Sequence, residues 1–309
     1  MNRLLPTVAP KFKIIVLLTL VLTILNACAE AEVEEPVITP PVVQPPTTPS
    51  EPVSAFLTKL MNFEGERRDY YVYQPANVSP ESDMMFVLHG FGGDARELRL
   101  LGFHELADET GMIIVYPQGL ISSNVESTYW NANFSFSNAP DDVAFLLELQ
   151  SRITTEYELQ NPSRYMTGIS NGGYMVNAFL CSNPEAIDLA INWIGSMNVA
   201  TYEQCDTEFE TPYLHVHGTN DMTIPYDVAF TEAEFNTPGS VPFVVDFIAQ
   251  KNGHTDYVDS VFSVDARLRR FTGGAFETWL ITVDGMGHVP PIEGLVEFNI
   301  FDVIKEFIQ

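Results

Sequence analysis

The sequence predicts an α/β fold in which a mostly parallel β-sheet is covered by helices on both faces. Short apolar runs alternate with amphipathic segments along most of the chain, which is the pattern of strands joined by helical crossovers. Glycines stand where several apolar runs end, as sharp strand-to-helix turns require. Beyond an N-terminal region of different composition, about 250 residues remain, enough for one domain with a large core.

The predicted elements follow from these runs. The expected strands are residues 70–73, 84–88, 112–116, 165–167, 189–194, 213–217, 268–271 and 278–283. The expected helices are residues 95–101, 104–110, 142–155, 173–180, 244–251 and 295–307. No internal repeat is present, so the alternation describes one domain, which we place at residues 56–309.

The N-terminus has the pattern of an export signal. Basic residues precede a short apolar run that ends at residue 25, as in a signal peptide, which residues 1–27 would form. The ending Leu25-Asn26-Ala27-Cys28 resembles the lipobox of bacterial lipoproteins. That resemblance implies lipidation of Cys28 and a membrane anchor, and Ala29 after the cysteine favours an outer-membrane, periplasmic or cell-surface location. A simple signal peptide or an uncleaved anchor is the alternative.

Residues 28–55 are acidic and rich in proline, with no apolar periodicity. Such a segment cannot bury enough surface to offset its ordering entropy, so we expect a semi-extended tether. The whole chain has a formal net charge of -26. A surface of this sign repels nucleic acid, which we exclude as a partner; the oligomeric state is left open.

The pentapeptide from Gly168 to Gly172 is the most informative motif. It has the form G-x-S-x-G and lies between a strand-like run and a helix-like run. A serine hydroxyl becomes a useful nucleophile when a sharp turn of this kind holds it beside a base. Ser170 is therefore the candidate nucleophile, and an ordinary helix N-cap is the alternative.

Candidate partners for Ser170 follow it in the chain. Asp221 comes just after the strand predicted at 213–217, and His288 comes just after the last predicted strand. Serine, then acid, then histidine, each after a strand, is the order in which α/β-hydrolases carry their catalytic triad. In such a triad the histidine moves the serine proton and the acid orients the histidine. Asp227 and His254 are the rivals for these two roles.

A glycine-rich loop follows the strand predicted at 84–88. In this arrangement the oxyanion hole combines the amide of the residue after the nucleophile with an amide from an early strand-to-helix loop. These donors would be Asn171 and Phe91, with glycines on both sides of Phe91 to let the backbone approach the substrate.

Together these motifs resemble the polyhydroxybutyrate depolymerase and feruloyl esterase group of α/β-hydrolases, the relatives of carbohydrate esterase family one. The matching segments are residues 88–93, 115–119, 129–131, 141–143, 168–173, 217–221, 225–226 and 285–288. The resemblance implies an α/β-hydrolase fold and a secreted serine carboxylic-ester hydrolase that works through an acyl-enzyme. Its substrates would be small or polymer-linked phenolic, acetyl or hydroxyalkanoate esters, and it would need no cofactor. The short stretch from 194 to 213 leaves no room for a large lid.

Four further residues complete the candidate set. His89 and Trp130 are candidates for the substrate pocket, although His89 could instead brace the oxyanion loop. Relatives often carry cysteines near Cys181 and Cys205, so the resemblance implies a disulfide between them, and two buried thiols are the alternative. The cysteines and histidines show no zinc-like spacing, and no metal is indicated.

Two other functions remain open at this point. One is a peptidase of the same fold. The other is a non-catalytic surface-binding lipoprotein, which a degraded triad would indicate.

Overall fold

The computed structural model describes residues 53–122, 126–134, 139–227 and 240–308. The predicted signal peptide, Cys28 and nearly all of the predicted tether lie outside the described residues. The unit from Glu51 to Gln309 is compact by itself, and its first strand begins at Ala55, next to the predicted boundary. Within the described residues, no helix combines the length and apolar character needed to cross a membrane.

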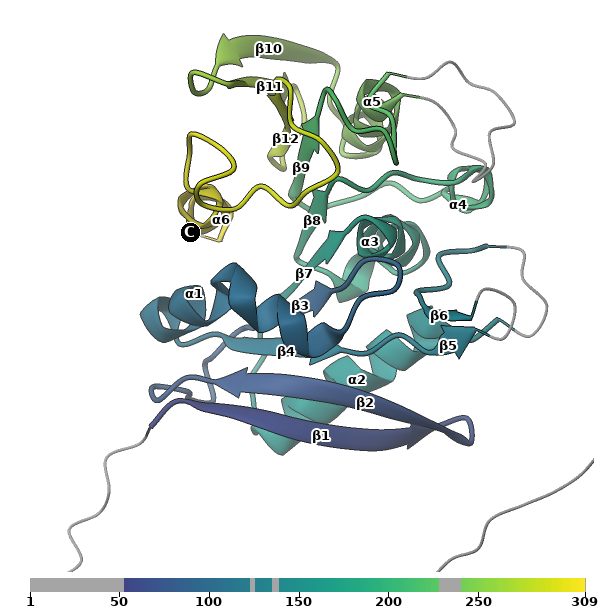
Figure 1. Cartoon of the computed structure of the whole chain (residues 1–309), viewed down its shortest axis with the longest axis vertical. Helices are drawn as coiled ribbons and strands as arrows, with labels where there is room; N and C mark the ends of the chain where they lie inside the picture. Colours follow the sequence, from purple (N-terminus) through teal and green to yellow (C-terminus); the bar gives the residue numbers. More distant parts are fainter. Residues whose placement is uncertain (1–52, 123–125, 135–138, 228–239, 309) are drawn as a thin grey trace, which may run out of the picture. The chain divides into compact units, whose positions relative to one another are not determined.

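Ten strands of the described chain form one large sheet, in the order β1-β2-β4-β3-β7-β8-β9-β12-β11-β10 (Figure 1). Their bounds are β1 Ala55–Phe63, β2 Glu66–Gln74, β3 Met84–Leu88, β4 Ile113–Pro117, β7 Arg164–Ile169, β8 Leu189–Trp193, β9 Tyr213–Gly218, β10 Asp256–Val261, β11 Ala266–Thr272 and β12 Thr278–Val283. A separate two-stranded ribbon contains β5 Ile121–Ser122 and β6 Ser127–Thr128.

The centre of the sheet is parallel and its two margins are antiparallel. Strands β4, β3, β7, β8, β9 and β12 pair in parallel, whereas β1, β2, β11 and β10 add antiparallel pairs. The carboxyl ends of the parallel strands therefore meet at one edge, where ligands of such sheets bind. The predicted mostly parallel sheet is confirmed.

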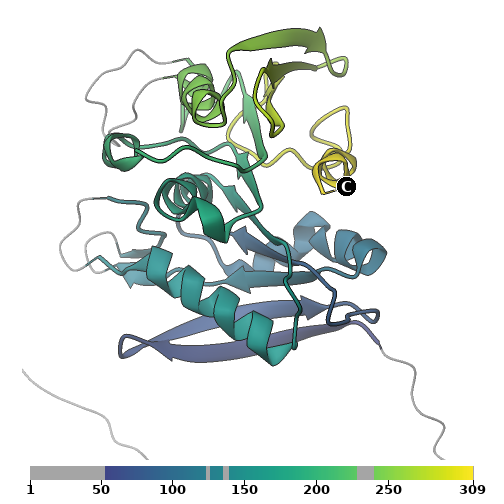
Figure 2. The same cartoon turned by 180° about the vertical axis from the view of Figure 1, so that it is seen from behind.

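Helices cover both faces. Their bounds are α1 Phe103–Thr110, α2 Asp142–Glu156, α3 Asn171–Ser182, α4 Val199–Gln204, α5 Val241–Lys251 and α6 Ile300–Phe307. Helices α2, α3 and α5 share one core with one face of the sheet, and α1 and α6 share a second core with the other face. Figure 1 shows α6 on one side of the twisted sheet and α5 on the other, and α2 lies in front of the sheet in Figure 2.

Strand β3 shows why the central strands are apolar throughout. Met84, Phe86 and Leu88 point into the core with α2, α3 and α5, whereas Met85 and Val87 point into the core with α1 and α6. Alternate side chains leave a strand on opposite faces, so a strand covered on both faces must be apolar at every position.

Some predicted elements differ from the structure. Residues 95–101 form a 3-10 helix. The helix predicted to start at 295 begins at Ile300, because Asn299 caps it by accepting from the Phe301 amide. Strand β1, strand β10 and the short helix α4, which lies between β8 and β9, were not predicted. Every residue of β10 is exposed, so its sequence carries no burial pattern.

Candidate active site

Ser170 stands at the sharp turn between β7 and α3. Its backbone has φ 55° and ψ -115°, a conformation that side-chain-bearing residues rarely adopt. The flanking glycines explain how the turn closes. A Cβ at Gly168 would lie 2.2 Å from the Gly172 carbonyl oxygen, and a Cβ at Gly172 would lie 2.4 Å from the Leu88 carbonyl oxygen. Only glycine fits at either place.

The Ser170 hydroxyl faces a histidine. Ser170 occupies the N-cap position of α3, but its side chain makes no cap hydrogen bond. Its Oγ lies 2.9 Å from Nε2 of His288. The alternative of an ordinary N-cap serine therefore does not describe this side chain.

His288 is in turn bonded to Asp221. Its Nδ1 lies 2.7 Å from Oδ2 of the carboxylate. Because a carboxylate only accepts, Nδ1 carries the proton and Nε2 is free to accept from the serine. The rivals lie elsewhere. Asp227 is exposed, and His254 bonds the Phe276 carbonyl oxygen at 2.7 Å.

Asp221 is buried and fully bonded. Its Oδ1 accepts from the amides of Thr223 and Ile224, both at 2.8 Å. Its Oδ2 also lies 3.3 Å from Nε2 of His217, a neighbour that the sequence analysis did not predict. Burial opposes ionisation of Asp221, but the hydrogen bonds from His217, His288 and Ile224 outweigh it and hold its pKa well below the ordinary value. The carboxylate that orients His288 is thus ionised.

The loop after β3 approaches the serine. A Cβ at Gly90 would lie 3.5 Å from Cβ of Ser170. The Gly92 amide donates to the Thr128 carbonyl oxygen at 2.8 Å, and the Gly93 amide donates to the Gly90 carbonyl oxygen at 3.0 Å. The Gly92 amide is therefore engaged with β6, and the Gly93 amide with its own loop. This supports the choice of the Phe91 amide as the loop donor of an oxyanion hole.

Asn171, which supplies the second predicted oxyanion amide, is held by its side chain. Its Oδ1 accepts from the Trp130 amide at 2.7 Å, and its Nδ2 donates to the Trp130 carbonyl oxygen at 3.0 Å. The indole Nε1 of Trp130 donates to the His89 carbonyl oxygen at 3.0 Å. The elbow, the Trp130 segment and the loop after β3 are therefore joined by hydrogen bonds.

The pocket role predicted for His89 and Trp130 does not fit their burial. Their exposed fractions are 1% and 0%, so neither ring reaches a surface open to substrate. His89 Nε2 accepts from the Gly119 amide at 2.9 Å, and its Nδ1 donates to the Gly90 carbonyl oxygen at 2.7 Å. Burial lowers the pKa of His89 to about 4. His89 is thus a neutral brace of the loop.

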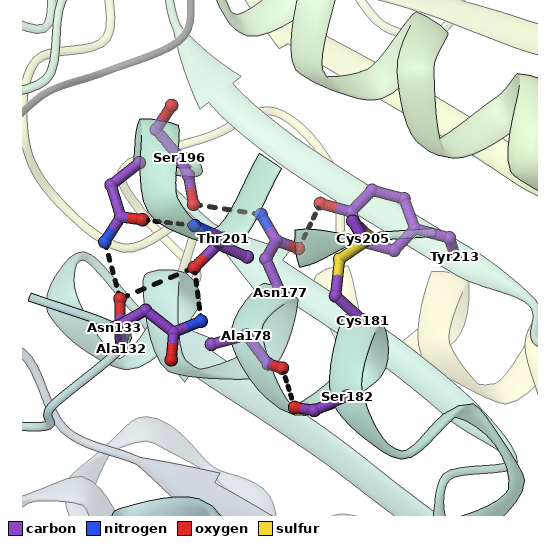
Figure 3. The surroundings of a disulfide bond; sticks show 11 residues. Ala132, Asn133, Asn177, Ala178, Cys181, Ser182, Ser196, Thr201, Cys205 and Tyr213 are labelled. Carbon is purple, nitrogen blue, oxygen red and sulfur yellow. Dashed lines mark hydrogen bonds between the residues drawn. A yellow bond between two sulfur atoms is a disulfide. The ribbon is translucent and has the colours of Figure 1, made fainter. Parts of the chain in front are cut away.

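A disulfide joins Cys181, near the end of α3, to Cys205, which follows α4 (Figure 3). Their Cα atoms are 4.8 Å apart. The bond fixes the end of the helix that begins at the nucleophile elbow.

Three large apolar side chains are exposed, one in the loop after β3 and two next to a triad residue in the sequence. Phe91 is 56% exposed in the loop after β3, and Met222, directly after Asp221, is 84% exposed. Val289, directly after His288, is 37% exposed. The triad contacts run from Ser170 to His288 and from His288 to Asp221, so Met222 and Val289 each directly follow a residue of the site.

Comparison with known proteins finds similar sequences and similar folds among esterases. No protein family model matches the chain. It is similar to a bifunctional acetylxylan esterase/xylanase of Neocallimastix patriciarum, with 26% identity over 53% of this chain and 23% of that protein. It is similar to an acetylxylan esterase of Coprinopsis cinerea, with 28% identity over 49% of this chain and 41% of the relative. It is also similar to feruloyl esterase B of Talaromyces funiculosus, with 26% identity over 43% of this chain and 38% of the relative. The matches thus span less than half of each relative.

Solved structures share the fold. An acetyl xylan esterase from Aspergillus awamori superposes with a TM-score of 0.63 at 15% identity, covering 82% of this chain and 98% of that one. Est1E from Butyrivibrio proteoclasticus gives a TM-score of 0.51 at 14% identity, covering 81% and 97%. The chain therefore has the α/β-hydrolase fold, and parts of its sequence are similar to acetylxylan and feruloyl esterases.

Proposed function

We propose that this protein is a serine carboxylic-ester hydrolase. The observation that carries the proposal is the continuous contact of Ser170 Oγ with His288 and of His288 with Asp221. Each atom in that line is of the type the reaction needs, in the tautomer it needs.

The mechanism follows from this geometry. His288 Nε2 removes the proton from Ser170 Oγ as the oxygen attacks the ester carbonyl carbon. The amides of Phe91 and Asn171 stabilise the oxyanion, and His288 returns the proton to the departing alcohol. The acyl group is then bonded to Ser170. Water, deprotonated by His288, attacks the acyl-enzyme, and His288 passes that proton to Ser170 Oγ as the acid is released. Asp221 keeps His288 in position and balances its charge throughout.

For the substrate we propose phenolic or acetyl esters, with hydroxyalkanoate polyesters as the second class. The names of the relatives favour the first class. The exposed side chains of Phe91, Met222 and Val289 favour an ester with an apolar or bulky flank, free or linked to a polymer. A non-catalytic binding protein would lack ester turnover dependent on Ser170, and a peptidase would in addition cleave peptide bonds.

The test is a panel of p-nitrophenyl acetate, p-nitrophenyl butyrate, methyl ferulate and amorphous polyhydroxybutyrate. We expect turnover that Ser170→Ala reduces by at least about 10⁴-fold. Ser182→Ala, on the same helix and bonded only to the Ala178 carbonyl oxygen, is the matched control and should keep wild-type turnover. Folded protein that hydrolyses no ester would contradict the proposal.

We also propose that residues 1–27 are an export signal, that residues 28–55 are a tether, and that Cys28 carries the lipid. Mass spectrometry of the N-terminal peptide should then find a diacylglyceryl group on Cys28, and Cys28→Ser should shift the protein from the membrane fraction to the soluble exported fraction. An unmodified Cys28 in the mature protein would contradict the lipid anchor.

A further inference from the structure

Asp221 has a second histidine behind it. His217 lies on β9 and is fully buried. Its Nε2 is 3.3 Å from the Asp221 carboxylate and 2.9 Å from the Ile224 carbonyl oxygen. Both neighbours only accept hydrogen bonds, so Nε2 of His217 carries a proton.

The contacts continue along β9. Nδ1 of His217 lies 3.2 Å from Nε2 of His215, and Nδ1 of His215 lies 3.1 Å from the Tyr213 hydroxyl. The hydroxyl lies 3.0 Å from Oδ1 of Asn177 on α3 (Figure 3). Asn177 is oriented by its Nδ2, which donates to the Ser196 carbonyl oxygen at 2.9 Å. His215, Tyr213 and Asn177 are also fully buried. We name Tyr213, His215 and His217 the β9 row.

The β9 row has an acceptor at each end and too few protons in its neutral form. The four contacts run from Asn177 to Tyr213, from Tyr213 to His215, from His215 to His217, and from His217 to the oxygens beyond it. Each contact needs one proton. A neutral tyrosine and two neutral histidines supply three. Either one buried contact is left without a hydrogen, which is unfavourable for buried polar groups, or the row holds a fourth proton.

We propose that the β9 row holds the fourth proton, so that His217 is a buried imidazolium and a positioning residue for Asp221. This inference rests on the proposed function, because Asp221 orients the catalytic base. Among the described residues, the titratable groups that face His217 are His215, Asp221 and Tyr226, whose ring lies 6.0 Å away and whose hydroxyl bonds Thr282. Asp221 supplies the negative charge that a buried imidazolium requires.

Two features of the structure agree with this placement of the charge. The His215 pKa is lowered well below the ordinary value, by burial first and by His217 second, so His215 is an unfavourable place for the extra proton. His217 Nε2 also lies 3.3 Å from the acid, so the charge there gains a charge-assisted hydrogen bond.

The direct test is the protonation of the ring nitrogens, read from ¹⁵N chemical shifts of the full chain labelled on histidine. The chain has 6 histidines, and His215→Gln and His217→Gln assign the two signals. At neutral pH we expect three N–H groups on the four nitrogens of this pair. Two N–H groups would overturn the proposal. This readout needs no substrate, so its failure is distinct from failure of the esterase function.

Tyr213→Phe is the sharper variant, because it removes one oxygen from a fully buried ring and lies away from Asp221. Without the hydroxyl, two neutral histidines can satisfy both remaining contacts. We therefore expect the pair to drop from three N–H groups to two. A pair that keeps three in Tyr213→Phe would overturn the proton count.

The catalytic readout uses the acid limb of the kcat/KM profile. Without a positive charge on His217, the negative charge of Asp221 acts on His288 alone, so the acid limb shifts to higher pH. The limb should move up by about one pH unit in Tyr213→Phe and His217→Gln. In His217→Gln kcat should also fall by up to about 10²-fold, because Asp221 loses the contact with His217 that holds it in position. KM should stay unchanged. His254→Gln, a buried histidine outside the β9 row, is the control and should leave the limb in place. A lower rate without movement of the limb in either β9 variant would mean a structural role only.

Discussion

Asn171 holds the backbone of Trp130 in both directions. The amide side chain accepts from the Trp130 N–H at 2.7 Å and donates to the Trp130 carbonyl at 3.0 Å. The residue that offers its own backbone amide to the oxyanion therefore also anchors a neighbouring segment with its side chain. The sequence predicted a role for the backbone amide of Asn171 but not for its side chain, which forms this anchor.

Replacing Asn171 by alanine keeps the backbone amide but removes both bonds to Trp130. We expect kcat to fall by about 10–10² because the elbow loses its alignment, and the free energy of unfolding to fall by about 1–3 kcal/mol because two buried backbone groups lose their partner. Steady-state kinetics and urea unfolding measure the two effects. Asn133→Ala removes one bond to Thr201 and is the control. Unchanged kcat in Asn171→Ala would show that the anchor does not align the site.

Loss of the disulfide should weaken the fold more than the chemistry. The bond closes a loop with a sequence separation of 24 residues, and the double variant Cys181→Ser/Cys205→Ser should lose about 3 kcal/mol of unfolding free energy. The midpoint of thermal unfolding should fall in the double variant, and it should fall by the same amount in wild-type protein treated with reductant. Reductant should leave the midpoint of the double variant in place, and any further fall there would point to a different cause.

A buried ion pair joins β2 to α2. The Asp142 carboxylate accepts from the Arg68 guanidinium and, through its other oxygen, from the Asn131 amide, each at 2.7 Å. Burial raises the pKa of Asp142, and the arginine opposes that shift. Asp142→Asn leaves Arg68 unpaired in the interior, so we expect a loss of about 3–5 kcal/mol in urea unfolding. The neighbouring Asp141→Asn removes an exposed cap charge from the same helix and should cost at most about 1 kcal/mol. Equal losses in the two variants would contradict this account.

His89 should make stability fall in mild acid. Its folded pKa of about 4 lies below the ordinary value of 6.5, so the unfolded chain binds a proton in that interval and the folded protein does not. The contribution of His89 is complete above about pH 6.5 and is lost as pH falls toward 4, by about 3 kcal/mol in total. Urea unfolding at pH 7.5 and pH 5 should show a smaller difference for His89→Gln than for wild type. An equal difference would exclude His89 as its source.

The sequence predicted the central sheet because its strands are buried on both faces and read as unbroken apolar runs. It also placed Ser170, Asp221 and His288 together from their order alone, since the ends of neighbouring parallel strands meet at one edge of the sheet. The nucleophile elbow was predictable for a further reason: the close approach of Gly172 to the Leu88 carbonyl oxygen excludes any side chain.

Other features depend on contacts between distant segments. The burial of His89 and Trp130 results from bonds to Gly119 and Asn171 that no local pattern encodes. The β9 row did leave a signal, because Tyr213, His215 and His217 alternate and must share one face of a strand. What the alternation could not show is that this face is fully buried, so that the three polar side chains bond to one another, to Asn177, to the Ile224 carbonyl oxygen and to the acid.

Strand β10 is an edge strand of the large sheet among the described strands. Its free edge could accept another strand, and Val258 and Val261 on it are exposed. Asp259 sits opposite Arg269 on β11 and forms an ion pair with it at 2.9 Å, which places charge on the margin. Colloidal stability therefore depends on charge at this margin as well as on the acidic surface, and neutralising Asp259 would leave Val258 and Val261 on an edge where chains assemble more readily.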